Sequence, residues 1–178
     1  MTIEVRRLSE SDDRTAFNCG DQQFDRFFRQ YAGQNQFRHY LGVTYVAVEA
    51  GRILGYATIS PSEVEVEDLP KSRRKDLKYP LPVLRLARLA VDAGHQRKGV
   101  GAILLRMVFE LAVRMAEEYG CHGVVVDAKE SAVAYYNRFG FEPMPVVEGA
   151  SSARPLQTPM FLSLKTILRA KTRGVRLP

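Results

Sequence analysis

Apolar residues recur at helical spacing in three segments of the chain. The first is rich in phenylalanine and has apolar side chains at positions 24, 27, 28, 31 and 32. The second runs from residue 101 to 118, with apolar positions at 103, 104, 107, 108, 111, 112 and 115, and Gly120 ends it. A short third helix is predicted at 131–138. Ser11-Asp12-Asp13-Arg14 resembles a helix N-cap and first turn, which predicts a further helix there.

Strand-like runs lie between these helices, at 3–8, 44–49, 53–66, 84–91, 123–127 and 161–167. Ala50-Gly51-Arg52 predicts a tight hairpin turn. The run at 84–91 is almost continuously apolar, which is typical of a central strand. The order of elements predicts an α/β fold of the α+β mixed-sheet kind, with helices on both faces. A V-shaped cleft is expected where neighbouring parallel strands diverge.

The chain has 178 residues, and we expect one domain over 1–168 and a basic C-terminal tail over 169–178. No apolar run approaches the roughly 18 residues of a membrane span, and residues 1–6 contain no signal-peptide core. Cys19 and Cys121 lie far apart and match no metal-binding spacing, so reduced thiols and no metal are expected. Together these features predict a cytoplasmic protein that does not contact membranes.

The formal net charge is +6, and its excess is concentrated in a basic run at 71–78 and in the last fourteen residues. Such a surplus favours an anionic partner, either nucleic acid, a phosphorylated cofactor or a membrane surface. The alternative is a solvated surface that only keeps the protein soluble. Composition leaves both open.

A glycine-containing loop, Gln96-Arg97-Lys98-Gly99-Val100-Gly101, separates the central strand from the long helix. The unpaired N–H groups and the dipole of a helix N-terminus favour a phosphate at such a place. The loop lacks the lysine and hydroxyl residue of a Walker A sequence, because Ala102 follows Gly101. Leu104 stands where a dinucleotide fingerprint needs glycine. Loops of this kind also occur without any ligand.

Two motifs resemble those of the GNAT acetyltransferases. The first is Leu-Ala-Arg-Leu-Ala-Val-Asp-Ala-Gly-His-Gln-Arg-Lys-Gly-Val-Gly at 86–101, and the second is Ala-Tyr-Tyr-Asn-Arg-Phe-Gly-Phe at 134–141. The resemblance implies that the loop holds the pyrophosphate of acetyl-CoA and that the strand end pairs with its pantetheine arm. The implied cofactor-binding residues are Leu89, Ala90, Val91, Gln96, Arg97, Lys98, Gly99, Val100, Gly101 and Asn137.

A narrower resemblance involves the N-terminal third. Phe-Asn-Cys-Gly at 17–20, Phe-Asp-Arg-Phe-Phe at 24–28 and Ala-Gly-Gln-Asn-Gln at 32–36 are similar to a segment of the acetyltransferase toxins of type II toxin–antitoxin modules. That subgroup acetylates the α-amino group of aminoacyl-tRNA and blocks translation. The resemblance implies an aminoacyl-tRNA substrate, a ribbon-helix-helix antitoxin as partner, and a homodimer.

The GNAT resemblance assigns Tyr136 as the general acid that protonates the leaving thiolate. A phenol has a reference pKa of about 10 and holds its proton at neutral pH. Tyr135 lies about 100° away around the same helix, so the two cannot face one cleft equally. No general base stands out among the nearby carboxylates, which are Glu63, Glu65, Glu67 and Asp92. An α-amine, with a pKa of about 7.7–8.0, needs less help from a base than a lysine at about 10.4.

Basic and amide side chains supply the predicted substrate and RNA-binding set: Arg73, Arg74, Lys75, Lys78, Arg85, Arg88, Gln34 and Asn35. The basic loop could instead dock an antitoxin or a second subunit. Two other functions remain open at this point. One is an N-acetyltransferase for a small-molecule or protein amine, and the other is a non-catalytic acyl-CoA sensor or RNA-binding module.

Overall fold

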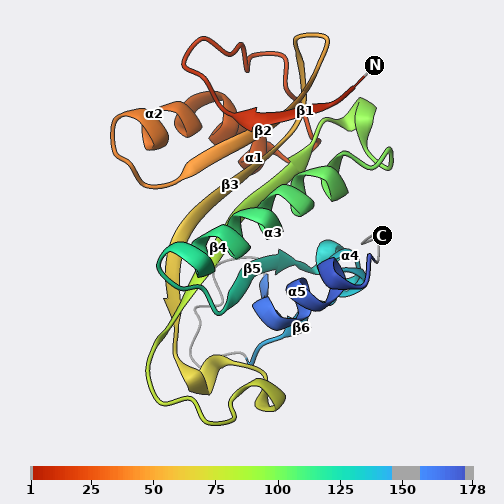
Figure 1. Ribbon diagram of the computed structural model, residues 1–178. Helices are drawn as coiled ribbons and strands as arrows, with labels where there is room; N and C mark the ends of the chain where they lie inside the picture. The colour runs from red at the N-terminus through yellow and green to blue at the C-terminus, as the bar shows by residue number, and fades with distance from the viewer. Residues whose placement is uncertain (1, 146–156, 175–178) are drawn as a thin grey trace. The chain divides into compact units, whose positions relative to one another are not determined.

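A computed structural model describes residues 2–145 and 157–174, and every structural statement below concerns those residues (Figure 1). The chain forms two compact units, each built from segments that are distant in sequence. Unit 1 comprises residues 1–60 and 86–108, and unit 2 comprises 61–85 and 109–178. No helix of the described residues is long and apolar enough to cross a membrane.

The strands are β1 (Glu4–Arg7), β2 (Val43–Glu49), β3 (Arg52–Val64), β4 (Leu81–Val91), β5 (Gly123–Lys129), β6 (Glu142–Pro143) and β7 (Gln157–Ser163). The α-helices are α1 (Gln22–Arg26), α2 (Ala32–Phe37), α3 (Val100–Glu118), α4 (Val133–Arg138) and α5 (Leu164–Thr172). One π-helical turn, η1 (Phe27–Tyr31), joins α1 to α2. Single 3₁₀ turns are η2 (Val66–Asp68), η3 (Lys71–Arg73), η4 (Ala93–His95) and η5 (Glu130–Ala132).

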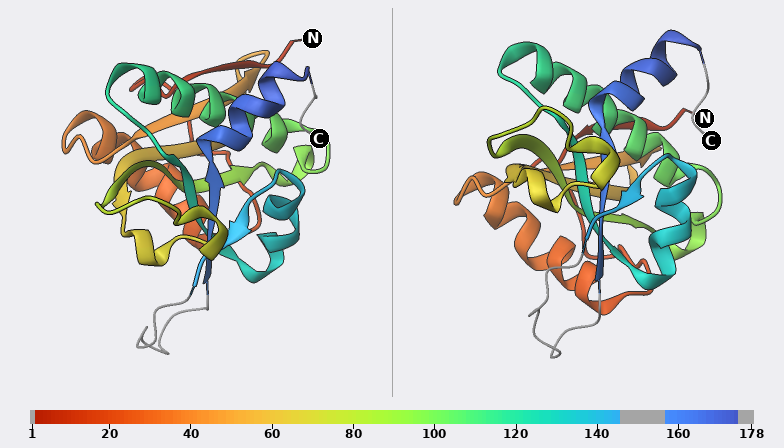
Figure 2. Two further views of the ribbon diagram at one scale, coloured as in Figure 1. Left: turned by 60° about the horizontal axis from the view of Figure 1, so that its bottom comes forward. Right: turned by 90° about the horizontal axis from the view of Figure 1, so that it is seen from below.

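Unit 1 has its strands in the order β1-β2-β3-β4, and helices cover both faces. On one face, Tyr56 of β3 stacks on Phe28 at 4.3 Å between ring centroids and donates a hydrogen bond to the Phe24 carbonyl oxygen at 2.9 Å. On the other face, a Cβ added to Gly55 would lie 3.1 Å from both Val100 and Leu104. Because neighbouring strand residues face opposite ways, the α1–α2 segment and the start of α3 lie on opposite faces (Figure 2).

Unit 2 is centred on β5, β7 and β6, which pair antiparallel, with Val125 opposite Phe161 in the register. Phe161 is fully buried in a cluster with Val83, Leu69 and Met144. The second half of α3 and the α4 segment meet through Phe109, whose ring lies 6.4 Å from Phe139. This packing holds the α4 helix against the rest of unit 2.

The predicted mixed α/β fold is confirmed, including the hairpin, the central strand and the long helix. The hairpin turn has Ala50 and Gly51 at φ of 48° and 76°, as a tight turn between twisted strands requires.

Two local predictions are wrong. Ser11–Arg14 is not helical, because the Asp12 carboxylate accepts from the Ser9 N–H and binds Arg6, while Asp13 accepts from Thr15. The last strand ends at Ser163, whose hydroxyl caps α5 by accepting from the Thr166 N–H at 3.1 Å. The residues expected to begin a tail, 169–172, are therefore helical, and 175–178 lie outside the described residues.

Candidate active site

The segment between β4 and α3, which we call the Gln96 loop (residues 96–101), has a conformation suited to anions. Arg97 and Gly99 adopt left-handed φ values of 61° and 86°. The first backbone hydrogen bond into α3 runs from the Ile103 N–H to the Gly99 carbonyl oxygen at 3.1 Å. The N–H groups that precede it have no acceptor within the helix, and they lie at the positive end of the helix dipole. A phosphate group fits this arrangement.

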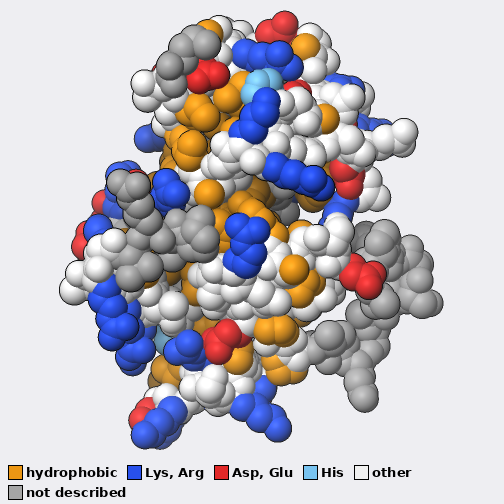
Figure 3. All heavy atoms as spheres, turned by 90° about the vertical axis from the view of Figure 1, so that its right-hand side faces the viewer, with side chains coloured by type: hydrophobic (Ala, Val, Ile, Leu, Met, Phe, Trp, Pro, Cys, Tyr) orange, Lys and Arg blue, Asp and Glu red, His pale blue; other side chains and the backbone are white. Residues whose placement is uncertain are grey.

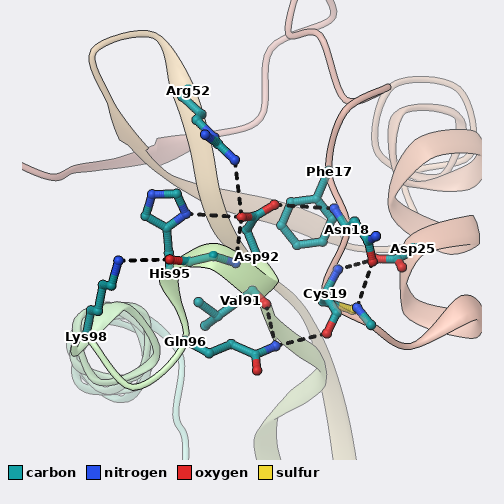
Figure 4. A network of polar contacts seen from close by, with 12 residues as sticks. Phe17, Asn18, Cys19, Asp25, Arg52, Val91, Asp92, His95, Gln96 and Lys98 are labelled. Atoms are coloured by element: carbon teal, nitrogen blue, oxygen red, sulfur yellow. Dashed lines mark hydrogen bonds and ion pairs between the residues drawn. The ribbon is translucent and has the colours of Figure 1, made fainter.

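Asp92 fixes the start of this segment (Figure 4). Its side chain is buried, and Oδ1 accepts from the Gly94 N–H at 3.2 Å and lies 3.1 Å from His95 Nδ1 and 3.4 Å from an Arg52 nitrogen. Oδ2 accepts from the Asn18 N–H at 3.4 Å. The carboxylate thus ties the strand end, the η4 turn and the segment around Asn18 together.

The surroundings of Asp92 make it an anchor rather than a base. Burial alone would raise the pKa of its carboxyl group. The hydrogen bonds from His95, Asn18 and Gly94 and the charge of Arg52 outweigh that effect, so the pKa lies below its ordinary value. A carboxylate with a lowered pKa and filled acceptor positions is poorly suited to removing a proton from an amine.

Two predicted cofactor-binding side chains hold the loop itself (Figure 4). The Gln96 side-chain amide donates to the Cys19 carbonyl oxygen at 2.9 Å and to the Val91 carbonyl oxygen at 3.1 Å. Lys98 Nζ donates to the Gly94 carbonyl oxygen at 2.9 Å. These contacts stabilise the loop conformation and leave its backbone N–H groups as the donors for a ligand.

Tyr136 lies on α4 in unit 2 and is 5% exposed. Its ring packs edge-on against Tyr135 at 5.5 Å and Phe141 at 5.3 Å. Burial, followed by the neighbouring Tyr135, raises the pKa of the Tyr136 phenol above its ordinary value, so the group keeps its proton at neutral pH. This is the state that a general acid needs before reaction.

Tyr135 has a different environment, although it is the next residue. Its hydroxyl oxygen is buried and has no hydrogen-bond partner in the part of the chain that the structure describes. Burial raises the pKa of Tyr135 to about 12. The ring packs against Phe139 at 5.1 Å, and the Arg138 guanidinium lies 6.0 Å from its centroid. Tyr135 therefore contributes mainly packing. Asn137, predicted to bind cofactor, is exposed.

The other carboxylates considered as a base are Glu63, Glu65 and Glu67, and all three are exposed near the end of β3 and η2. None of the three carboxylate groups forms a hydrogen bond or an ion pair with another described residue. None of these three carboxylates therefore has the surroundings expected of a general base.

The predicted substrate residues have varied surroundings. Arg85 binds Asp127 at 2.8 Å, Arg73 binds Glu142 at 2.8 Å, and Arg74 donates to the Leu69 carbonyl oxygen at 2.8 Å. These three guanidinium groups are committed to contacts within unit 2. Lys75 and Lys78 of the same loop are exposed.

In unit 1, Arg88 of β4 is half-buried over the ring of Phe27, with 3.8 Å between the guanidinium carbon and the ring centroid. Gln34 is exposed and Asn35 is half-buried at the end of the helical segment. The neighbouring Gln36, which sequence reasoning did not single out, bridges the Leu8 carbonyl oxygen and the Thr44 N–H. The described residues contain no cluster of three or more potential metal ligands among His, Cys, Asp and Glu.

Comparison with known families shows to which class of protein the chain belongs. The family model described as an acetyltransferase (GNAT) domain matches residues 41–143. The chain belongs to the GNAT acetyltransferase family. It is therefore an acetyltransferase, and the expectation drawn from the motifs at 86–101 and 134–141 is confirmed.

Individual relatives are similar to this GNAT acetyltransferase over most of its length. A "tRNA-acetylating toxin" of Mycobacterium tuberculosis (strain ATCC 25618 / H37Rv) is 34% identical over 143 residues, which are 79% of this chain and 84% of that protein. The structure of AtaT complexed with acetyl-methionyl-tRNAfMet is 26% identical with a TM-score of 0.83, covering 96% of this chain and 99% of that one. AtaTR bound with AcCoA is 28% identical with a TM-score of 0.77, covering 95% and 98%.

Proposed function

We propose that this enzyme transfers the acetyl group of acetyl-CoA to the α-amino group of aminoacyl-tRNA and blocks translation as the toxin of a toxin–antitoxin module. The observation that carries the proposal is the 34% identity, over 79% of the chain, with a tRNA-acetylating toxin. The likeness to AtaT in complex with acetyl-methionyl-tRNAfMet supports the same substrate class. We further propose that both units form one GNAT domain, because neither unit is a continuous stretch of chain.

Acetyl-CoA supplies the acetyl group as an activated thioester. The backbone N–H groups of the Gln96 loop, with Arg97 and Lys98 adding positive charge, would hold its phosphates. The strand end at 89–91 would bind the pantetheine arm and polarise the thioester carbonyl through a backbone N–H. The left-handed Arg97 and Gly99 and the contacts of Gln96 and Asp92 support this assignment, because they preorganise the loop.

Tyr136 would act as the general acid. Its phenol keeps its proton at neutral pH, and it would give that proton to the thiolate sulfur as the carbon–sulfur bond breaks. The amine forms the new carbon–nitrogen bond and releases one proton to water, and the Tyr136 phenolate takes one proton back from water, so the proton count balances. Tyr135 is the control residue for Tyr136 on the same helix, because its buried hydroxyl has no hydrogen-bond partner among the described residues.

None of the four described carboxylates considered as a base is built for that role, and this favours an α-amine as acceptor. Asp92 is engaged by its own donors, and Glu63, Glu65 and Glu67 are exposed. A lysine ε-amine, with a pKa of about 10.4, is almost entirely protonated at pH 7 and needs such a base. An α-amine of about 7.7–8.0 is partly neutral without help.

Positive charge supports a nucleic-acid substrate. The face in Figure 3 has more lysine and arginine side chains than acidic ones, and the chain has a net charge of +6. The exposed Lys75 and Lys78 would contact tRNA phosphates, which gives affinity without sequence readout. A ribbon-helix-helix antitoxin, a homodimer and a cytoplasmic location complete the proposal, because a toxin of this class needs a neutralising partner and acts where tRNA is charged.

Transfer of labelled acetyl groups tests the proposal. The enzyme is incubated with labelled acetyl-CoA and bulk tRNA charged with amino acids, with uncharged tRNA as the matched control. Label on charged but not on uncharged tRNA is expected. Transfer to small amines with no label on any charged tRNA would instead support a small-molecule or protein acetyltransferase.

A further inference from the structure

Arg88 is a cation whose guanidinium has no anionic partner in the part of the chain that the structure describes. It lies on β4 just before the strand end at 89–91, and its guanidinium is half-buried 3.8 Å from the centroid of the Phe27 ring. This guanidinium forms no hydrogen bond or ion pair with any other residue that the structure describes. The other arginines of the basic set have partners: Arg85 binds Asp127, and Arg73 binds Glu142. Arg88 therefore differs from these arginines in having no described ion-pair partner.

The environment of Arg88 disfavours its charge. Desolvation lowers the pKa of the guanidinium, and the only opposing influence is the phenol of Tyr56. No carboxylate contributes to this shift of the Arg88 pKa. An arginine stays protonated in spite of such a shift. A fixed, partly desolvated charge without a counterion is an arrangement that an anionic ligand would stabilise.

The side chain is also held in place. Phe27 is itself buried and packs with Tyr56 and Phe28 in the aromatic core of unit 1. Stacking on this ring occupies one face of the guanidinium and leaves its N–H groups, which point outward in the plane, as donors. A planar donor fork of this kind binds phosphate in two-point geometry.

We propose that Arg88, positioned by Phe27, binds a phosphate of the tRNA acceptor end and so selects nucleic-acid acceptors beside the strand end at 89–91. The inference rests on the proposed function and adds a residue that determines acceptor specificity. The same chemistry could serve a phosphate of the cofactor. The position favours the acceptor, because the Gln96 loop already offers the N–H groups and charge that the cofactor phosphates need.

The test compares Arg88→Met, Arg88→Lys and Phe27→Leu with Arg106→Met, an exposed arginine on α3, across the sheet from Phe27 in the same unit. Binding of uncharged tRNA is measured by fluorescence anisotropy as a function of salt. Steady-state KM values are measured for charged tRNA and for acetyl-CoA. Circular dichroism and urea unfolding establish that each variant is folded.

Arg88→Met is expected to weaken tRNA binding and raise the KM for charged tRNA about 10-fold or more, with the KM for acetyl-CoA unchanged. The slope of log affinity against log salt should fall by about 0.7, the value for one phosphate contact on a single strand. Arg88→Lys should recover part of the affinity, and Phe27→Leu should lose part of it. Arg106→Met should leave the KM values unchanged.

Two results would overturn the proposal. A raised KM for acetyl-CoA with unchanged tRNA binding would assign the anion to the cofactor. Unchanged values for both substrates in a folded Arg88→Met variant would leave Arg88 without a binding role. Failure of the proposed function can be distinguished from failure of the Arg88 proposal. If the proposed function is wrong, the wild-type enzyme itself puts no label on charged tRNA.

Discussion

The side-chain amide of Gln96 donates a hydrogen bond to the carbonyl oxygen of Cys19 at 2.9 Å, although 77 positions separate the two residues in sequence. A second bond from the same nitrogen reaches the Val91 carbonyl oxygen at 3.1 Å. One glutamine thus joins the N-terminal segment, the end of β4 and the Gln96 loop (Figure 4). Loss of this link should loosen the loop without removing any of its backbone donors.

Replacing Gln96 by leucine should weaken acetyl-CoA binding roughly 5-fold to 30-fold, because two hydrogen bonds that fix the loop are lost. Isothermal titration calorimetry with acetyl-CoA measures the effect. Gln23→Leu, at an exposed position of α1 in the same unit, is the control and should bind like wild type. Equal affinities for Gln96→Leu and wild type would show that the side chain does not position the loop.

Asp92→Asn should lower the free energy of unfolding by about 1–3 kcal/mol, because the buried carboxylate loses its charge-assisted contacts with His95 and Arg52. Asp127→Asn is the matched control, since Asp127 binds Arg85 with 48% of its side chain exposed. A surface pair of this kind contributes at most about 1 kcal/mol. Urea unfolding at pH 7 measures both variants, and equal effects would contradict the anchoring role.

The pH dependence of stability gives Asp92 a second test. Its folded pKa lies below the ordinary value of 3.8, so its contribution is present above that value and is lost as the pH falls through the folded pKa. Wild-type protein should lose more stability than Asp92→Asn as the pH is lowered below about 4. Parallel curves of unfolding free energy against pH for the two proteins would show that titration of the Asp92 carboxylate does not affect stability.

His122 predicts a pH effect nearer to neutrality. Burial, followed by the charges of Lys165 and Arg73, lowers the pKa of this imidazole below its ordinary value of 6.5. The unfolded chain therefore takes up the proton first, and stability should fall as the pH drops below about 6.5 toward the folded pKa. Urea unfolding between pH 8 and 5 should show a smaller fall in His122→Gln. The control His39→Gln, at an exposed position, should retain the wild-type slope.

Tyr136→Phe should reduce kcat by about 100-fold to 10,000-fold while acetyl-CoA still binds, because only the donated proton is removed. Tyr135→Phe should keep wild-type turnover and should be equally or more stable, since its buried hydroxyl has no partner among the described residues. Pre-steady-state transfer from labelled acetyl-CoA measures the chemical step. Similar losses in the two variants would mean that packing of α4 is what matters.

The spacing of apolar residues and the turn residues predicted two kinds of element correctly. These are helices with one apolar face and turns whose flanking strands are close in sequence. The apolar stripe of α3 and the Ala50-Gly51 turn are of this kind. The pattern failed at Ser11–Arg14 because Asp12 and Asp13 accept from nearby backbone N–H groups in turns, which polar residues can do as readily as cap a helix. It failed after Ser163 because alternating apolar residues in a short run fit both strand and helix.

The site was predictable only in part for a related reason. The motifs point to the Gln96 loop and to Tyr136, whose roles stay predictions, but nothing in the sequence indicates the structural role of Asp92. Its partners Asn18 and Arg52 lie 74 and 40 positions away, and only tertiary structure brings their N–H groups to one carboxylate. The Arg88 guanidinium has no counterion among the residues with a described structure, and the sequence could not indicate this because it depends on packing.

The most direct measurement of the central claim identifies the acetylated atom. Charged tRNA is treated with the enzyme and acetyl-CoA, digested with nuclease, and the terminal aminoacyl-adenosine is analysed by tandem mass spectrometry. We expect an added acetyl group on the α-amino nitrogen of the amino acid, absent with Tyr136→Phe over the same time. Unmodified aminoacyl-adenosine under conditions where wild-type enzyme acetylates a small amine would contradict it.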